Sequence, residues 1–298
     1  MKLRDLQYLV AVDEERHFHR AAERCFVSQP TLSGQLKKLE EELGVALVER
    51  STRQVVMTDV GSAIAEQARK VLTEAKGIQE IAQTYHDPMA GDLHTGLIPT
   101  LAPYLLPRIM PAINRKYPQL KLWLHEYQTA ELLEKLRRAE LDLLILALPV
   151  GTDEFLEIDL FEEDFLLAVS SDDPLAQRST IGMDELSARE MLLLEEGHCL
   201  RQQALDVCFA AGAKENSVYH ASSLETLRHM VAEGMGTTFF PELAVPAKQT
   251  KKDAVRYIPF KKPKPSRRVG MLYRKGSHRE LTYRTLKTTI KTTLFSGS

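Results

Sequence analysis

The sequence predicts a multidomain α+β protein with an N-terminal winged helix-turn-helix, a long linker helix and a C-terminal α/β domain of two subdomains. Three patterns predict it: short helices followed by a strand-forming segment, a proline-free heptad repeat, and a long alternation of strands and helices. We place the domains at residues 1–58, 59–87 and 88–298. A chain of 298 residues is long enough for two or more domains.

Residues 1–58 have the pattern of short helices around a shared core. Leucines near the N-terminus recur at helical spacing, and Ala21 and Ala22 allow a second helix to approach closely. Ser28 is a good N-cap. Pro30 falls in the first turn of the next helix, where its missing N–H removes no intrahelical bond. That helix then carries an inward apolar stripe of Leu32, Leu36 and Leu39.

The same helix opens with polar side chains that suit base edges and phosphates in a DNA groove. The segment from Arg50 to Thr58 has β-propensity and cations, as a wing that touches phosphates would have. Residues 1–58 contain nine basic and nine acidic residues, so the prediction depends on cations gathering on one face and not on net charge. The candidate DNA-binding residues are Ser28, Gln29, Thr31, Ser33, Gln35, Lys38, Arg50 and Arg53.

Residues 59–86 contain no proline and repeat every seven positions. One row of the repeat is Ile64, Val71, Ile78 and Tyr85, and the other is Ala68, Ala75 and Ala82. This seam predicts a helix about 40 Å long that pairs with a second copy, parallel or antiparallel. The alternative is a helix that packs on its own domain. We favour dimerisation because the helix follows directly from the predicted DNA-binding motif, and dimers read two half-sites.

After a hinge at residues 86–91, strand and helix patterns alternate. Such alternation predicts a parallel sheet of βαβ units, in a body of two lobes with a cleft between them. The expected strands are Leu93–Ile98, Lys121–Glu126, Leu141–Leu148, Leu166–Ser170, Met191–Leu194, Thr237–Phe240 and Val269–Tyr273. The expected helices are Tyr104–Lys116, Ala130–Ala139, Leu200–Ala211 and Ser223–Ala232.

Composition and motifs narrow the class of protein. The chain has a net charge of −2 and no apolar run near the roughly 20 residues that cross a bilayer. The N-terminus has no signal-peptide core, so we expect a cytoplasmic protein without a membrane partner. Three cysteines, none in a CxxC pair, predict neither a permanent disulfide nor a zinc site. No nucleophile elbow, P-loop or HExxH motif is present, so we expect neither an enzyme nor a cofactor.

The first segment is similar to one known family. The run Phe18-x-Arg20-Ala21-Ala22 and the denser run from Val27 to Leu47, with Arg50 after it, resemble the LysR-type regulators. The resemblance extends over essentially the whole chain. It implies a DNA-binding transcription regulator with a linker helix and a periplasmic-binding-protein-like effector domain of two subdomains. It also implies promoter DNA and RNA polymerase as partners, and a homodimer or homotetramer.

A second set of residues resembles the peroxide-sensing members of that family. It comprises Gly197-His198-Cys199-Leu200-Arg201 with Cys208, the run Ser222–Leu227, and Ile98-Pro99-Thr100. The resemblance implies an activator of oxidative-stress genes whose signal is hydrogen peroxide. Peroxide would oxidise Cys199, and Cys208 would then form a disulfide with it. The implied peroxide pocket contains Thr100, Thr129, His198 and Arg201. One departure is Gln202, where an acidic residue is expected.

The residues themselves are consistent with this chemistry. Peroxide attack needs a thiolate, and Cys199 would stand at a helix start, where free N–H groups and a partial positive charge favour the anion. His198 and Arg201 add local charge, and either Arg267 or Arg268 could approach from elsewhere. If residues 200–211 are helical, the two cysteines lie roughly 13 Å apart along the axis. A disulfide needs Cα atoms within about 7 Å, so its formation requires this segment to refold.

Two other functions remain open at this point. The first is a LysR-type regulator that answers a small metabolite in the cleft between the lobes, with the cysteines incidental. The second is a thiol peroxidase with an appended DNA-binding domain, which would turn over steadily with a reductant. Cys25 is expected to be a plain core residue of the helix-turn-helix.

Overall fold

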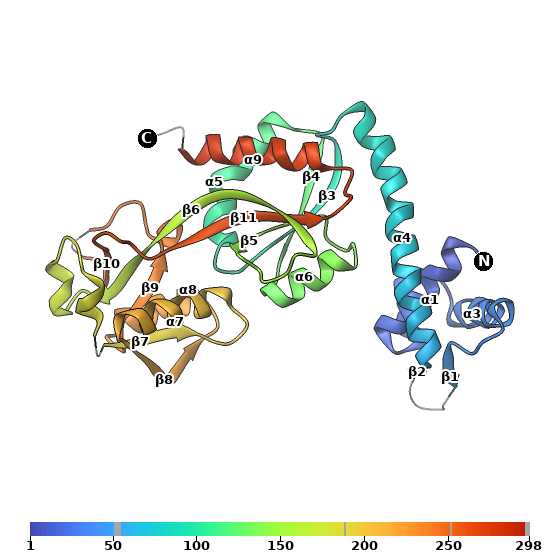
Figure 1. The fold of residues 1–298 in the computed structure, drawn as a ribbon, viewed down its shortest axis with the longest axis horizontal. Helices are drawn as coiled ribbons and strands as arrows, with labels where there is room; N and C mark the ends of the chain where they lie inside the picture. The colour runs from blue at the N-terminus through green and yellow to red at the C-terminus, as the bar shows by residue number, and fades with distance from the viewer. Residues whose placement is uncertain (51–54, 188, 251, 296–298) are drawn as a thin grey trace. The chain divides into compact units, whose positions relative to one another are not determined.

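The computed structural model describes residues 1–50, 55–187, 189–250 and 252–295 (Figure 1). The chain divides into two compact units, Met1–Tyr85 and His86–Ser298. Across these described ranges, no helix combines the length and the apolar character needed to span a membrane.

The first unit is a three-helix core followed by a β-hairpin and a long helix. Its elements are α1 (Leu3–Glu15), α2 (Phe18–Arg24), α3 (Gln29–Leu43), β1 (Val48–Arg50), β2 (Val55–Met57) and α4 (Asp59–His86). The hydroxyl of Ser28 accepts the N–H of Thr31 at 3.3 Å and so caps α3. Gly44 ends α3 at φ 70°, a left-handed conformation that glycine adopts without strain. Because β1 pairs antiparallel with β2, the predicted winged helix-turn-helix is confirmed.

Among the described side chains of α4, those that join the core of this unit lie in the first half of the helix. Ala65 and Ala68 are buried with the residues of α1–α3, and Leu72 packs at the edge. Further along, Ile78 is 70% exposed and Ile81 is 46% exposed. Packing on its own domain therefore accounts for the first half of α4, while the second half carries exposed apolar side chains.

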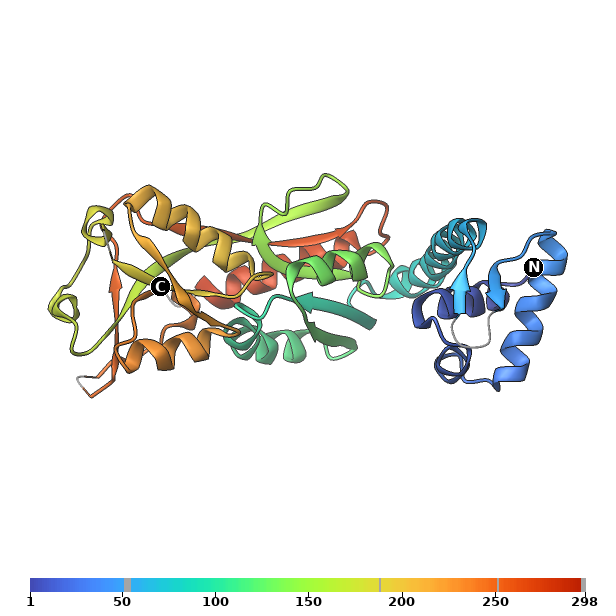
Figure 2. The same ribbon diagram turned by 90° about the horizontal axis from the view of Figure 1, so that it is seen from below.

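The second unit is built on a seven-stranded sheet and a separate strand pair (Figure 2). The large sheet has the order β10-β6-β11-β5-β3-β4, with β9 also on β6. Its strands are β3 (Gly91–Leu97), β4 (Leu120–Glu126), β5 (Leu143–Leu148), β6 (Phe155–Ser170), β9 (Thr238–Pro241), β10 (Val255–Pro259) and β11 (Ser266–Arg274). The parallel pair is β7 (Glu190–Leu194) and β8 (Lys214–Ala221). The helices are α5 (Ala102–Lys116), α6 (Thr129–Arg137), α7 (Cys199–Ala211), α8 (Leu224–Ala232) and α9 (Glu280–Phe295), with 3-10 turns at Pro174–Gln177, Met183–Leu186 and Glu242–Ala244.

Two separate hydrophobic cores define two lobes. The first lobe gathers β3–β5, β11, α5, α6 and α9, and the second gathers β7–β10, α7 and α8. Strand β6 serves both, because its Phe155 belongs to the first core and its Phe165 to the second. This division agrees with the predicted domain of two subdomains.

The expectation of a parallel sheet is wrong for four of the six strand pairs in the large sheet. Strand β3 is parallel to β4 and β5, but β11 is antiparallel to both β5 and β6. The reason is that the chain returns from the second lobe and inserts β11 between β5 and β6. Strands β8 and β10 and helix α9 were not predicted, and β6 begins eleven residues before the expected Leu166. The first part of β6 alternates acidic with apolar residues, which hides it from a search for apolar runs.

Helices cover both faces of the first-lobe sheet. On one face Thr95 and Leu97 of β3 lie against α5 and α9. On the other face α6 approaches so closely that a Cβ on Gly96 would lie 2.5 Å from Leu132. Since β3 and β4 are parallel, the chain leaves both strands at the same edge of the sheet, where Thr100 lies in the loop after β3 and Thr129 begins α6 after β4. Ligands of α/β sheets commonly bind at this edge.

Candidate thiol site and helix-turn-helix face

Cys199 is the first residue of α7, with His198 as its N-cap. The preceding Gly197 has φ 94°, and a Cβ there would lie 2.1 Å from Oε1 of Gln128. Gln128 is in turn the N-cap of α6. The start of α7 therefore lies against the start of α6. Neither N-cap side chain accepts a hydrogen bond from its helix, so both helices bring uncapped N–H groups and partial positive charge to this place.

The two cysteines of α7 have different surroundings. Cys199 is half-buried and packs against the core of the first lobe, although α7 belongs to the second. Cys208 is only 3% exposed and lies in the second core. Burial, and to a lesser extent the charge of Glu215, raises the pKa of the Cys208 thiol to about 11. Both thiols are free in a continuous helix, so about 13 Å of helix axis separates them.

His198 and Arg201 contact residues of the second lobe. Arg201 donates to the carbonyl of Leu194 at 2.9 Å and pairs with Glu215 at 2.7 Å. Burial lowers the pKa of His198, against opposing effects of Glu195 and the Ser222 backbone. Burial therefore favours the neutral form of His198, and the charge of Arg201 is balanced by the carboxylate of Glu215.

Thr100 is held by a buried arginine. The side chain of Arg267 has no exposed surface and donates to Oγ1 of Thr100 at 3.1 Å and to its carbonyl at 3.2 Å. The Nε of Arg267 donates to Glu163 at 2.7 Å. Glu163 also accepts the N–H of Leu243 at 2.8 Å. Of the two arginines that the sequence left open, Arg267 is thus the buried one, while Arg268 is exposed and pairs with Asp159.

Sequence reasoning missed the Arg267–Glu163 pair, although one signal could have found it. Arg267 alternates with Val269 and Met271 along β11, and those two residues are fully buried. Period-two alternation therefore places Arg267 on the inward face, where a charged side chain needs a partner.

Thr129 is the first residue of α6, and its hydroxyl, unlike that of Thr100, is not held by any arginine that the structure describes. Its Oγ1 is buried and has no hydrogen-bond partner among the described residues. Buried hydroxyls normally have partners, and an orphan next to a cavity or a reactive group often receives a water or a ligand. The described part of the chain shows no group of three or more His, Cys, Asp or Glu side chains that could hold a metal ion.

The helix-turn-helix residues lie on the outer side of α3. Ser28, Gln29, Thr31 and Lys38 are exposed, and Ser33 and Gln35 are half-buried, while the leucine stripe is in the core. Arg50 is the last residue of β1. Arg53 lies outside the described residues. Cys25 is half-buried at the edge of the same core, and burial raises the pKa of its thiol.

Comparison with known families covers nearly the whole chain. Residues 3–62 match the bacterial regulatory helix-turn-helix proteins of the lysR family, and residues 86–294 match the LysR substrate binding domain. The chain is 50% identical over 291 residues to the DNA-binding transcriptional dual regulator OxyR of Escherichia coli K12, covering 98% of this chain and 95% of that protein. It is 53% identical over 277 residues to a hydrogen peroxide-inducible genes activator of Haemophilus influenzae, covering 93% and 92%.

Solved structures agree with these relationships. A full-length OxyR variant from Pseudomonas aeruginosa superposes with a TM-score of 0.79 at 41% identity, covering 98% of this chain and 95% of that one. The reduced form of OxyR superposes with a TM-score of 0.65 at 43% identity, covering 71% and 99%. The chain therefore belongs to the LysR family of bacterial regulators and, within it, to the hydrogen peroxide-inducible gene activators that include OxyR.

Proposed function

We propose that this protein is a DNA-binding transcription activator that senses hydrogen peroxide through Cys199 and Cys208 and controls oxidative-stress defence genes. The observation that carries the proposal is the place of Cys199, at the uncapped start of α7 and against the start of α6. Two helix N-termini thus bring uncapped N–H groups and partial positive charge to the sulfur that attacks peroxide. The protein acts as a cytoplasmic sensor and not as an enzyme, reacting about once in each cycle of oxidation and reduction.

The reaction has two steps. The thiolate of Cys199 attacks one oxygen of hydrogen peroxide, the S–O bond forms, the O–O bond breaks, and hydroxide leaves and is protonated to water. The thiolate of Cys208 then attacks the sulfur of the sulfenic acid, the disulfide forms, and the second oxygen leaves as water. Peroxide is reduced by two electrons, which the two thiols supply. The hydroxyls of Thr100 and Thr129 orient the oxidant, and Arg267 fixes that of Thr100.

The second step cannot take place on an intact α7. Cys199 is the first residue of α7 and Cys208 lies about two and a half turns further along it, so the two sulfurs are beyond the reach of a disulfide. The segment therefore unwinds after the first step, and the reduced and oxidised proteins differ in local fold. This difference biases the packing of subunits and so the spacing of the DNA-binding helices.

We divide the roles along the chain as follows. Residues 1–58 bind promoter DNA through Ser28, Gln29, Thr31, Ser33, Gln35 and Lys38 of the helix-turn-helix and through Arg50 and Arg53 of the wing. Residues 59–87 dimerise through the exposed apolar side chains of α4, and residues 88–298 sense the signal. A second dimer surface would give a homotetramer, and RNA polymerase is the partner in activation.

Thiol trapping tests the proposal. Purified reduced protein receives about one equivalent of hydrogen peroxide, is alkylated, and is analysed by mass spectrometry. We expect a Cys199–Cys208 disulfide that is absent in Cys199→Ser. An unmodified Cys199 would contradict the sensor and redirect the search to a metabolite. A pocket of about 640 Å³ near Asp173 and Glu233 lies within the second lobe, so this pocket is not the cleft between lobes which that alternative needs. Steady peroxide turnover with a reductant would instead identify an enzyme.

A further inference from the structure

The junction between α1 and α4 contains an ionic network that the proposed function does not use. Helix α1 ends in Asp13, Glu14 and Glu15 and has no basic residue in its last turn. Carboxylates at a helix C-terminus face the negative end of the helix dipole. This arrangement is unfavourable unless cations from other elements compensate it.

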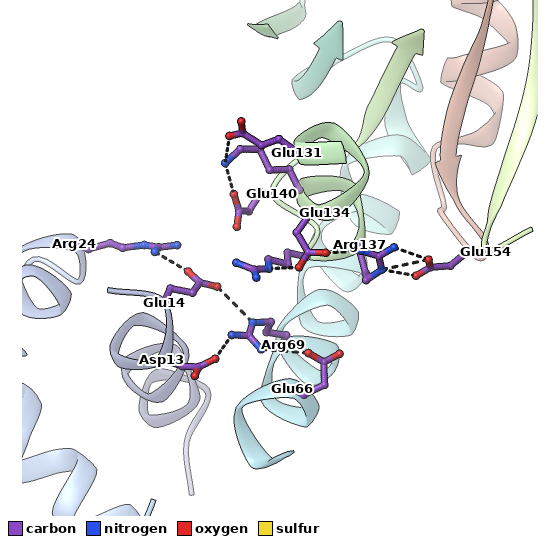
Figure 3. A network of polar contacts seen from close by, with 12 residues as sticks. Asp13, Glu14, Arg24, Glu66, Arg69, Glu131, Glu134, Arg137, Glu140 and Glu154 are labelled. Atoms are coloured by element: carbon purple, nitrogen blue, oxygen red, sulfur yellow. Dashed lines mark hydrogen bonds and ion pairs between the residues drawn. The ribbon is translucent and has the colours of Figure 1, made fainter. Parts of the chain in front are cut away.

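Arg69 of α4 provides that compensation (Figure 3). Its guanidinium donates to Asp13 and, at 3.4 Å, to Glu14, and it also binds Glu66 on its own helix at 3.2 Å. The side chains of Arg69, Asp13 and Glu14 are only 13%, 9% and 10% exposed. Arg24 at the end of α2 binds the other oxygen of Glu14 at 2.6 Å. Three helices of the first unit thus meet in one largely buried network.

The position of Arg69 along α4 allows the network to affect the direction in which α4 leaves the first unit. Of the apolar side chains of α4 that the structure describes, Leu72 is the last that packs against the core of this unit, and Ile78 and Ile81 beyond it are exposed. Arg69 therefore acts close to the point where α4 leaves the helix-turn-helix. From there to His86 the helix extends about 25 Å. A tilt of about 10° at Arg69 would move the far end by about 4 Å, close to one base-pair step of ~3.4 Å.

We propose that Arg69, with Asp13 and Glu14, is a brace that sets the angle between α4 and the recognition helix and thereby selects the spacing of DNA half-sites. The inference rests on the proposed function, because spacing has meaning only for a DNA-binding dimer joined through α4. Arg69 is a positioning residue and touches no DNA. Loss of Arg69 has a larger effect on the preferred distance between half-sites than on the affinity for a single half-site.

Selection from a random duplex library tests the brace. Selection with the full-length wild-type protein first identifies the half-site sequence. Binding is then measured on duplexes in which the distance between two such half-sites is changed in single base-pair steps. In Arg69→Met, the aliphatic stem still packs but the charge and the donors are gone. We expect the preference for the best spacing over its neighbours to fall about fivefold or more. Arg69→Lys, which keeps a cation between the two carboxylates, restores part of the preference.

Arg16→Met is the matched control. Arg16 binds Asp13 at 2.8 Å and is 51% exposed, so this change removes the same charge from the same carboxylate without touching α4. We expect it to keep the wild-type spacing profile. An Arg69→Met protein with the wild-type profile, or with equal losses at every spacing, would overturn the brace alone. If Arg69→Met fails to fold, Asp13→Asn replaces it with the same expectation. A wild-type protein that binds no duplex would overturn the proposed function as well.

Discussion

The requirement that α7 unwinds can be tested at Gly212, its C-cap. Gly212 has φ 68°, and its N–H bonds to the last turn of the helix. A Cβ there would meet only Oγ of Ser187, at 3.7 Å, so Gly212→Ala adds backbone strain without a clash. A left-handed conformation costs a non-glycine residue about 1–2 kcal/mol. Opening the helix releases that strain, so the open fraction should rise about 5–30-fold, and formation of the disulfide should accelerate by the same factor.

The assay separates the two chemical steps. Sulfenic acid formation is measured in a Cys208→Ser background, and disulfide formation by acid quench, alkylation and mass spectrometry. Gly276→Ala is the control, because Gly276 also has positive φ (81°) with nothing within 4 Å of an added Cβ, but lies far from α7 in sequence. We expect acceleration of the second step in Gly212→Ala only. Equal rates in Gly212→Ala and wild type, or equal acceleration in Gly276→Ala, would refute the unwinding argument.

Three further predictions address the thiol, the threonines and the wing. The pKa of Cys208 is about 11 in the folded helix and near the ordinary 9.0 once the segment opens. The thiolate fraction of Cys208 increases tenfold per pH unit below its pKa. If opening comes first, the rate of disulfide formation, measured by acid quench at a series of pH values, should level off near pH 9. A rate that continues to rise toward pH 11 would mean that the closed helix reacts. Thr129→Val removes an unpartnered buried hydroxyl, so it should slow sulfenic acid formation and leave the melting temperature unchanged or higher. Thr100→Val leaves a donor of Arg267 unpaired, so it should lower the free energy of unfolding in urea by about 1–3 kcal/mol. The same stability loss in both variants would contradict this contrast. Arg50→Gln should weaken binding on all DNA sequences and lower the salt slope by about one unit in a titration, and a loss at one base position only would count against a phosphate contact.

The sequence predicted those elements correctly whose structure depends on residues close together in the chain. The cap Ser28, the stop at Gly44 and the leucine stripe between them define α3, and all act within one helix. The break at Gly197 and the start of α7 were found for the same reason. The heptad in α4 was informative only in part, because Ala68 is buried by its own domain while Ile78 is exposed.

Contacts between segments far apart in the chain could not be predicted from the sequence. Arg267 binds Thr100 across 167 positions and Glu163 across 104, and no local pattern selects these partners. The antiparallel insertion of β11 also depends on where the chain returns from the second lobe. Helix α9 was missed because its six threonines and few leucines weaken the helical pattern. Its Tyr283 and Ile290 nevertheless join the first core, so packing overrides the weak propensity.

The place of α7 in the fold explains how its unwinding could reach the rest of the domain. Helix α7 is the crossover between the parallel strands β7 and β8. Among the described residues these strands pair with each other and, through one bridge, with Thr237. A two-stranded sheet is marginal without the helix that covers it, and β7 and β8 already change register between Met191 and Leu193. Strand β8 leads into α8, whose Glu225 accepts the hydroxyl of Tyr104 from α5 at 2.9 Å. Loss of α7 therefore acts first on the weakest sheet of the domain and then on a hydrogen bond between the two lobes.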